Sequence, residues 1–121
     1  MFQGLALQNI ETLNDLWVET IITQCPHCFN TLGNEYPQFG GDYHVVHHSE
    51  FLSQLVEEGR LVPESTGETI VFHDPCYLGR HNDTFLAPRT VIDSMGVRVE
   101  MKRNGMNSFC CGAGGGKFWY E

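Results

Sequence analysis

Apolar positions along the chain change between helical spacing and short β-branched runs, which predicts strands and helices in alternation. Apolar residues three and four positions apart predict an amphipathic helix over residues 9–17, and the run 18–23 predicts a buried strand after it. The same alternation continues toward the carboxyl end of the chain. Further strands are expected at residues 43–47, 69–72 and 97–101, and further helices at residues 29–36, 49–59 and 88–96.

Capping residues and large aromatic side chains refine this pattern. Ser49 is expected to be the N-cap of the third helix, since serine side chains accept hydrogen bonds from the first turn. Pro88 is expected to begin the fourth helix, because proline lacks the N–H that a first helical position leaves unpaired. Trp17 and Phe51 are expected in the core.

Strands and helices that alternate with short links are typical of an α/β fold. We therefore expect a three-layer Rossmann-like domain with a mostly parallel sheet. In such sheets ligands bind beyond the carboxyl ends of the strands. Any cofactor site is accordingly expected in the loops that follow the strands.

Charge and hydropathy restrict the class of function. Residues 1–59 contain eight acidic and no basic side chains, while residues 60–121 are balanced. A nucleic-acid-binding protein would need clustered Lys and Arg, so nucleic acid is not an expected partner. No apolar run reaches the roughly 20 residues of a membrane span, and no signal peptide is evident. We expect a cytoplasmic protein, or one peripheral to a membrane complex.

The cysteines carry the chemistry that this sequence predicts. They are Cys25, Cys28, Cys76, Cys110 and Cys111. Each group follows a predicted strand, so all three groups are expected at one edge of one sheet. Disulfides are rare in the cytoplasm, and an odd number of cysteines opposes simple pairing. Thiolates supplied by short loops are the usual ligands of iron-sulfur clusters, so we interpret all five as cluster ligands.

Two other readings of the same cysteines stay open. Three or four thiolates can form a tetrahedral zinc site of structural type, and the isolated chain can also hold no metal. A thioredoxin-like dithiol site at Cys25-Pro26-His27-Cys28 is the third reading, because such enzymes place this motif between a strand and a helix. That reading leaves the other three cysteines without a role.

Three segments of the chain resemble a known family. ITQCPHCFNTL, FHDPCYLGRHN and FCCGAGGGKFW are similar to the CCG, or cysteine-rich, domain of heterodisulfide reductase and of the iron-sulfur subunits of glycolate, lactate and glycerol-3-phosphate oxidoreductases. The resemblance implies an electron-transfer domain within an iron-sulfur oxidoreductase complex, and not a complete enzyme. It also implies a flavin- or quinone-linked redox subunit and other iron-sulfur subunits as partners.

The order of the motifs differs from the family pattern. A family unit runs from a single Cys through Cys-Cys-Gly to Cys-X-X-Cys, whereas this chain begins with Cys25-X-X-Cys28. We expect residues 1–121 to be a fragment that spans the junction of two such units in a longer protein. The resemblance implies a 4Fe-4S cluster of noncubane form, with Cys25 and Cys28 serving one cluster. It assigns Cys76, Cys110 and Cys111 to a second cluster.

Polar residues around Cys76 are further candidates for the site. His73, Asp74, Arg80 and His81 can orient a thiolate, bind a carboxylate or relay protons, although ordinary turn and surface roles are equally open. The pair His47-His48 is interpreted as structural.

Overall fold

The computed structural model describes residues 1–114 and 119, and within them strands and helices alternate as predicted. The helices are α1 (Phe2–Asp15), α2 (Pro26–Asn30), α3 (His48–Glu57) and α4 (Leu86–Asp93). The strands are β1 (Thr20–Thr23), β2 (His44–His47), β3 (Thr69–Val71) and β4 (Val97–Val99). A π turn (Thr31–Glu35) and a 3-10 turn (Tyr36–Phe39) extend α2, and a second 3-10 turn (Gly105–Asn107) precedes the last cysteines.

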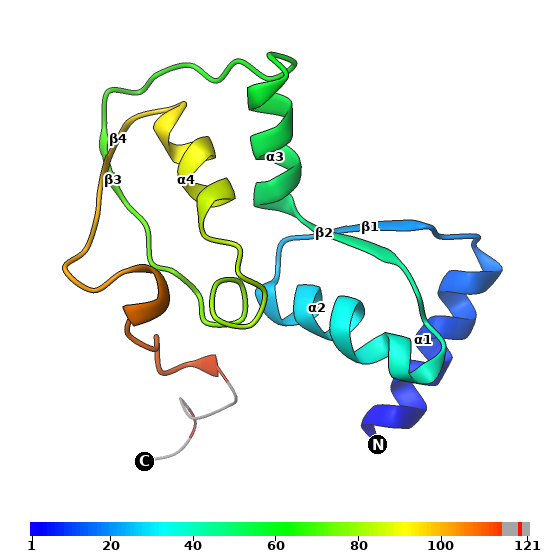
Figure 1. The fold of residues 1–121 in the computed structure, drawn as a ribbon. Helices are drawn as coiled ribbons and strands as arrows, with labels where there is room; N and C mark the ends of the chain where they lie inside the picture. Colours follow the sequence, from blue (N-terminus) through cyan, green and yellow to red (C-terminus); the bar gives the residue numbers. More distant parts are fainter. Residues whose placement is uncertain (115–118, 120–121) are drawn as a thin grey trace.

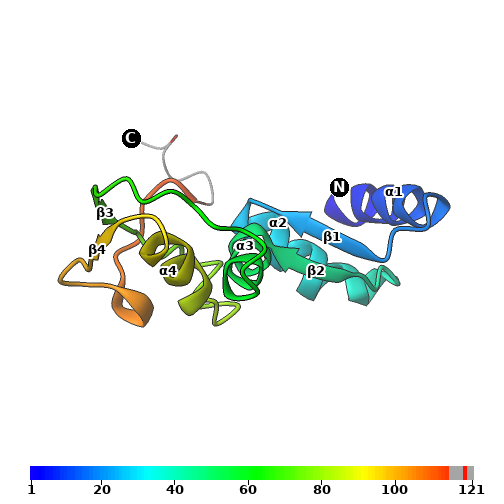
Figure 2. The ribbon, with the colours of Figure 1, turned by 90° about the horizontal axis from the view of Figure 1, so that it is seen from above.

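Strand pairing is parallel, as predicted, but the described strands form two separate pairs where the sequence predicted one sheet. β1 pairs with β2, and β3 pairs with β4. Helices α3 and α4 pack against each other between the two pairs, in both views (Figures 1 and 2). This helix pair separates the sheets, so the chain consists of two β-α-β units joined through α3 and α4.

Helix boundaries differ from the predicted ones where local hydrogen bonds favour another residue. The N-cap of α3 is His47, not Ser49: its ring Nδ1 accepts from the Ser49 backbone N–H, and Glu50 accepts from the His47 N–H at 3.1 Å. The prediction that Ser49 caps this helix is therefore wrong. Helix α4 begins at Leu86, two residues before the expected Pro88, which lies within its first turn.

The main core lies between α1 and the first β-α-β unit. Ala6 and Ile10 of α1 pack with Tyr36 and Tyr43, and Tyr43 donates to Asn14 Oδ1 at 2.9 Å. Trp17 is not part of this core, which corrects the prediction. It is 89% exposed at a φ of 55°, because the chain reverses after α1 in a left-handed turn that directs the side chain to solvent.

The second aromatic core prediction also fails. Phe51 is 39% exposed, because the face of α3 that carries it is not covered within the described residues. Helical spacing identified an apolar stripe but not which of its members a neighbouring element covers.

Candidate metal centre

The first cysteine group lies where β1 leads into α2. Cys25 is the N-cap of α2, in an extended conformation, and Pro26 occupies the first helical position. The Cys28 backbone N–H lowers the pKa of Cys25 by hydrogen bonding to its sulfur, while the thiol of Cys28, which also hydrogen-bonds to Cys25, has its pKa raised. The two side chains are thus direct neighbours at an exposed helix start.

The second group combines the other three cysteines. Cys76, Cys110 and Cys111 line one cavity of about 440 Å³, although 33 residues separate Cys76 from Cys110. His27 and His73 contribute to the same wall. The structure therefore brings the two later cysteine segments together, as the sequence predicted. It does so without the single sheet edge on which that prediction depended.

Backbone N–H groups of the glycine-rich loop face the sulfurs of the last two cysteines. The Gly112 N–H donates to Cys110 Sγ at 3.4 Å, and the N–H groups of Ala113 and Gly114 lower the pKa of Cys111. Gly112 has a φ of 80°, a conformation that suits glycine because it has no Cβ. Successive N–H groups of this kind form a concave site that stabilises negative charge on sulfur.

Side chains next to Cys76 hold the loop that leads to Cys110. The ring of His73 bonds through Nε2 to the Phe109 carbonyl at 2.7 Å. Arg80 donates to the carbonyls of Met106, at 3.0 Å, and Ser108. His73 and Arg80 were candidates from the sequence, and they act by positioning this loop.

Asp74 forms a buried ion pair in this region. Its carboxylate is 2% exposed and binds Arg89 through two hydrogen bonds of 2.7 and 2.8 Å. It also accepts from the Gly105 N–H at 2.6 Å, and its own carbonyl accepts from Ser108 Oγ at 3.0 Å. The Arg89 hydrogen bonds hold the pKa of Asp74 below its usual value despite burial. Asp74 thereby fastens residues 105–108 to the Cys76 turn.

Sequence reasoning missed two of these partners. Arg89 lies in α4 and Ser108 in the loop before Cys110, far in sequence from Asp74. The sequence did show an acidic residue, Asp74, directly before the Pro75-Cys76 turn, and this position indicates that Asp74 needs a polar partner. Only the fold shows which basic residue satisfies it.

The donor set fits an iron-sulfur centre. Among the described residues, no three His, Cys, Asp or Glu side chains are close enough to hold one ion. A zinc ion with bonds of about 2.3 Å would draw its sulfurs to roughly 4 Å from one another. A cluster is larger, and it suits thiol groups spread around one cavity with N–H groups directed at their sulfurs.

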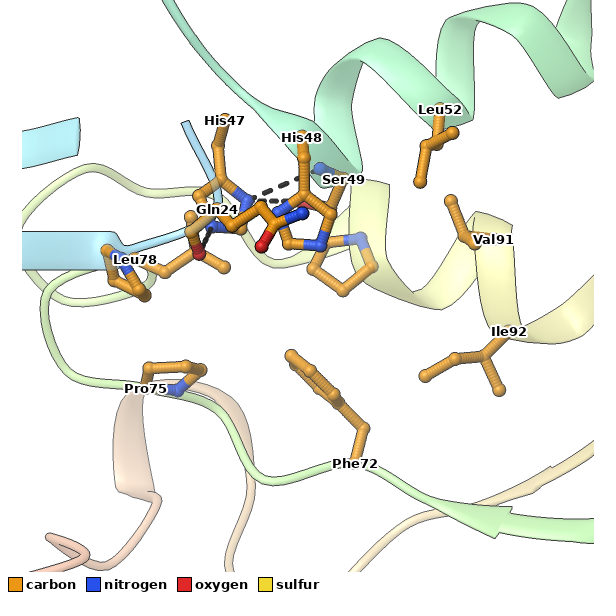
Figure 3. A pocket seen from close by; sticks show the side chains of 12 residues that line it. Gln24, His47, His48, Ser49, Leu52, Phe72, Pro75, Leu78, Val91 and Ile92 are labelled. Carbon is orange, nitrogen blue, oxygen red and sulfur yellow. Dashed lines mark hydrogen bonds between the residues drawn. The ribbon is translucent and has the colours of Figure 1, made fainter. Parts of the chain in front are cut away.

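A second cavity, of about 410 Å³, lies between α3 and α4 on the other side of the Pro26 and Pro75 turns. Figure 3 shows Phe72 facing across it toward His48, with Val91 and Ile92 on a third side. No cysteine lines this cavity, and its walls are mainly apolar. It is therefore not a candidate metal centre.

His47, at the rim of this second cavity, has both ring nitrogens engaged. Nδ1 lies 2.8 Å from Ser49 Oγ and accepts from the Ser49 N–H, so Nε2 is the nitrogen that donates to the Gln24 carbonyl at 3.0 Å. Burial of the ring lowers the pKa of His47, the hydrogen bond to the Gln24 carbonyl opposes this effect, nearby His48 adds to it, and Glu50 opposes it. Both ring nitrogens of His47 thus have hydrogen-bond partners within the protein, which supports the structural role expected from the sequence.

This assignment predicts a pH dependence of stability. The unfolded state takes up a proton at His47 near pH 6.5, and the folded state does so only at lower pH. The contribution of neutral His47 to the free energy of unfolding is therefore present above about pH 6.5, and it is lost as the pH falls below this value. We expect His47→Gln to reduce the decline in unfolding free energy between pH 7 and pH 5, measured by urea denaturation. His44→Gln, on the same strand but exposed, is the control, and an equal decline in wild type and His47→Gln would contradict the assignment.

None of the helices in the described part of the chain has the length and apolar character needed to cross a membrane.

The family model of the CCG cysteine-rich domain matches residues 1–33 and 70–121. These two segments contain all five cysteines. No solved structure matches the chain.

Curated relatives agree with this family match. An EtfAB:quinone oxidoreductase of Syntrophomonas wolfei is 46% identical over 100% of this chain and 17% of its own length. The probable iron-sulfur-binding oxidoreductase FadF of Bacillus subtilis is 46% identical over 100% of this chain and 18% of its own length. A component of the dihydromethanophenazine:CoB--CoM heterodisulfide reductase of Methanosarcina mazei is 39% identical over 93% of this chain and 29% of its own length.

The chain thus spans less than a third of each of these relatives. The family match rests on the segments that carry the cysteines, and the resemblance inferred from the three cysteine motifs is confirmed. This chain belongs to the CCG cysteine-rich domain family.

Proposed function

We propose that this chain is an iron-sulfur-binding electron-transfer module of a longer oxidoreductase. The observation that carries the proposal is the cavity shared by Cys76, Cys110 and Cys111, with backbone N–H groups directed at two of the sulfurs. Iron-sulfur clusters are bound mainly by cysteine thiolates, and hydrogen bonds to sulfur tune their potentials. Relatives named as iron-sulfur-binding oxidoreductase and heterodisulfide reductase support the same role.

The five cysteines are proposed to serve two clusters. Cys25 and Cys28 hydrogen-bond to each other at the start of α2, whereas Cys76, Cys110 and Cys111 face a common cavity. This division supports two 4Fe-4S centres of noncubane form. Cys25 and Cys28 are proposed as ligands of one centre, and Cys76, Cys110 and Cys111 as ligands of the other. The remaining ligands of each centre are proposed to come from other parts of the parent protein.

Residues 1–121 are proposed to span the junction of two CCG units. Two-stranded sheets seldom stand alone, and Val71, Val97 and Val99 of the second pair are about half exposed. In the parent protein each pair is proposed to join a larger parallel sheet, which would complete a three-layer Rossmann-like domain on each side of α3 and α4. The coverage of 17–29% of the relatives' lengths is consistent with additional chain of this kind.

Redox proteins are the proposed partners. A relative named EtfAB:quinone oxidoreductase supports a flavin- or quinone-linked donor or acceptor, alongside other iron-sulfur subunits. A cytoplasmic location, either free or peripheral to a membrane complex, stays a prediction.

When bound, a cluster would store and pass on single electrons. The protein's part is to hold the ligands and to stabilise negative charge. Cys76 comes from the turn after β3, and Cys110 and Cys111 come from a loop that Asp74, Arg80 and His73 fasten to that turn. The N–H groups of residues 112–114 favour the thiolate forms that ligation requires.

Anaerobic reconstitution of the full-length protein with iron and sulfide tests the proposal. We expect a broad brown visible absorbance and a paramagnetic signal on reduction or oxidation, with iron and acid-labile sulfide in comparable amounts. A colourless full-length protein would contradict the proposal. Elemental analysis separates the two alternative functions. Zinc without sulfide would indicate a structural metal site, whereas a protein without metal would leave the thioredoxin-like dithiol site at Cys25 and Cys28.

A further inference from the structure

His27 lies at a place where the two cysteine groups approach each other. It stands between Cys25 and Cys28 in sequence, and it lines the cavity of Cys76, Cys110 and Cys111. It also lines a neighbouring cavity that contains Cys28. One imidazole therefore borders the space beside both groups.

The ring of His27 contacts the segment that carries Cys76. It packs on Tyr77, the residue after Cys76, with ring centroids 4.4 Å apart and planes at 40°. Tyr77 stacks in turn on His81 at 4.5 Å and 18°. Ring contacts of this kind favour particular relative placements, so they restrict where the imidazole can lie.

A polar cluster fixes the same two segments beside this stack. Asn82 donates to the Tyr77 carbonyl at 2.6 Å and to Asn30 Oδ1 at 3.2 Å, while Asn34 donates to Asn82 Oδ1 at 2.8 Å. These contacts tie α2 and the turn after it to the Cys76 loop. The position of His27 is therefore set from both sides.

The third cysteine segment also meets His27. A Cβ built at Gly114 would lie 3.4 Å from His27 Nε2, so this nitrogen faces the backbone of the Cys-Cys-Gly loop. The His27 side chain is exposed to solvent, which makes a role in core packing a poor explanation for these contacts. A nitrogen directed at a loop of cysteines can act as a hydrogen-bond donor to sulfur.

We propose that His27 is a positioning residue of the centre formed by Cys76, Cys110 and Cys111, although it belongs to the other cysteine group. Its ring fixes the spacing of the three cysteine segments, and its Nε2 donates a hydrogen bond to a sulfur of the group bound there. This inference rests on the proposed iron-sulfur function. Such a hydrogen bond stabilises the more negative, reduced form and raises the reduction potential of the centre.

Redox titration of the reconstituted full-length protein tests this role. His27→Phe keeps a ring that can pack on Tyr77 but removes both nitrogens. We expect this variant to retain iron and sulfide, and to show a potential lower by about 59 mV, which corresponds to a tenfold change in the one-electron equilibrium. The signal to follow is the one that disappears when Cys76, Cys110 and Cys111 are replaced by serine.

Two further variants separate hydrogen bonding from packing. His27→Gln places an amide nitrogen near the position of Nε2, and we expect it to restore most of the potential. His81→Phe makes the same change on the far side of Tyr77, and we expect it to leave the potential unchanged.

The outcomes distinguish this inference from the function on which it rests. A wild-type protein that binds no iron-sulfur centre overturns both proposals. A loaded wild type whose potential equals that of His27→Phe overturns only the role of His27. If His27→Phe loses iron, His27→Gln decides: recovered iron supports the proposal, and loss of iron from both variants overturns it.

Discussion

Asp74→Asn should destabilise the fold by about 3 kcal/mol, measured by urea denaturation under reducing conditions. Removing one partner of a buried ion pair costs about 3–5 kcal/mol, because it leaves the other charge without compensation. Asp74 is 2% and Arg89 12% exposed, so both charges are removed from bulk water. The lower end of the range is expected since Arg89 keeps its contact with Glu100 at 2.8 Å.

Asp93→Asn is the matched control for this prediction. Asp93 also binds an arginine in a forked arrangement, with Arg98 at 2.8 and 3.0 Å, but its side chain is 48% exposed. Exposed pairs contribute about 0–1 kcal/mol, so this identical substitution should have a small effect. Equal losses in the two variants would show that burial of Asp74 does not determine its contribution.

The same substitution should also change the candidate metal centre. The Asp74 carboxylate accepts from the Gly105 N–H and binds Arg89, so its charge couples the loop before Cys110 to the turn that carries Cys76. We expect Asp74→Asn to lower the iron content of the reconstituted protein, and Asp93→Asn to leave it unchanged.

Replacing the two cysteine groups separately should remove two different clusters. We expect Cys25→Ser with Cys28→Ser to abolish one paramagnetic signal of the full-length protein, and Cys76→Ser with Cys110→Ser and Cys111→Ser to abolish another. The reason is that the first two cysteines hydrogen-bond to each other while the other three face one cavity. Iron and sulfide analysis and electron paramagnetic resonance provide the measurement.

The internal control is the stability of each variant without metal. Cys25, Cys28, Cys110 and Cys111 are exposed, so serine at these positions should change the unfolding free energy little. If both sets of substitutions abolish the same signal and leave no other, all five cysteines serve a single cluster and the proposed division is wrong.

The chain's local patterns identified its elements and its chemistry. Apolar spacing predicted the order of strands and helices, because backbone geometry imposes a period of 3.6 residues on helices and 2 on strands. Cys-X-X-Cys, the single Cys76 and Cys-Cys-Gly identified the family, because ligands of a cluster must come from short loops whose spacing is visible in sequence. The prediction that Cys76 lies near Cys110 and Cys111 came from an expected single sheet, and the structure brings these cysteines together without that sheet.

Other properties depend on which elements meet, and only the tertiary structure decides them. The separation into two strand pairs follows from the packing of α3 against α4, a contact between helices about 30 residues apart that no local pattern specifies. The exposure of Trp17 depends on the left-handed turn that follows α1, and the pairing of Asp74 with Arg89 depends on the fold that brings α4 to the Cys76 turn. The sequence by itself determined where the thiol groups proposed as cluster ligands occur, because that is a property of the side chains. The approach of His27 to the other two cysteine segments was decided in three dimensions, since it requires loops distant in sequence to converge.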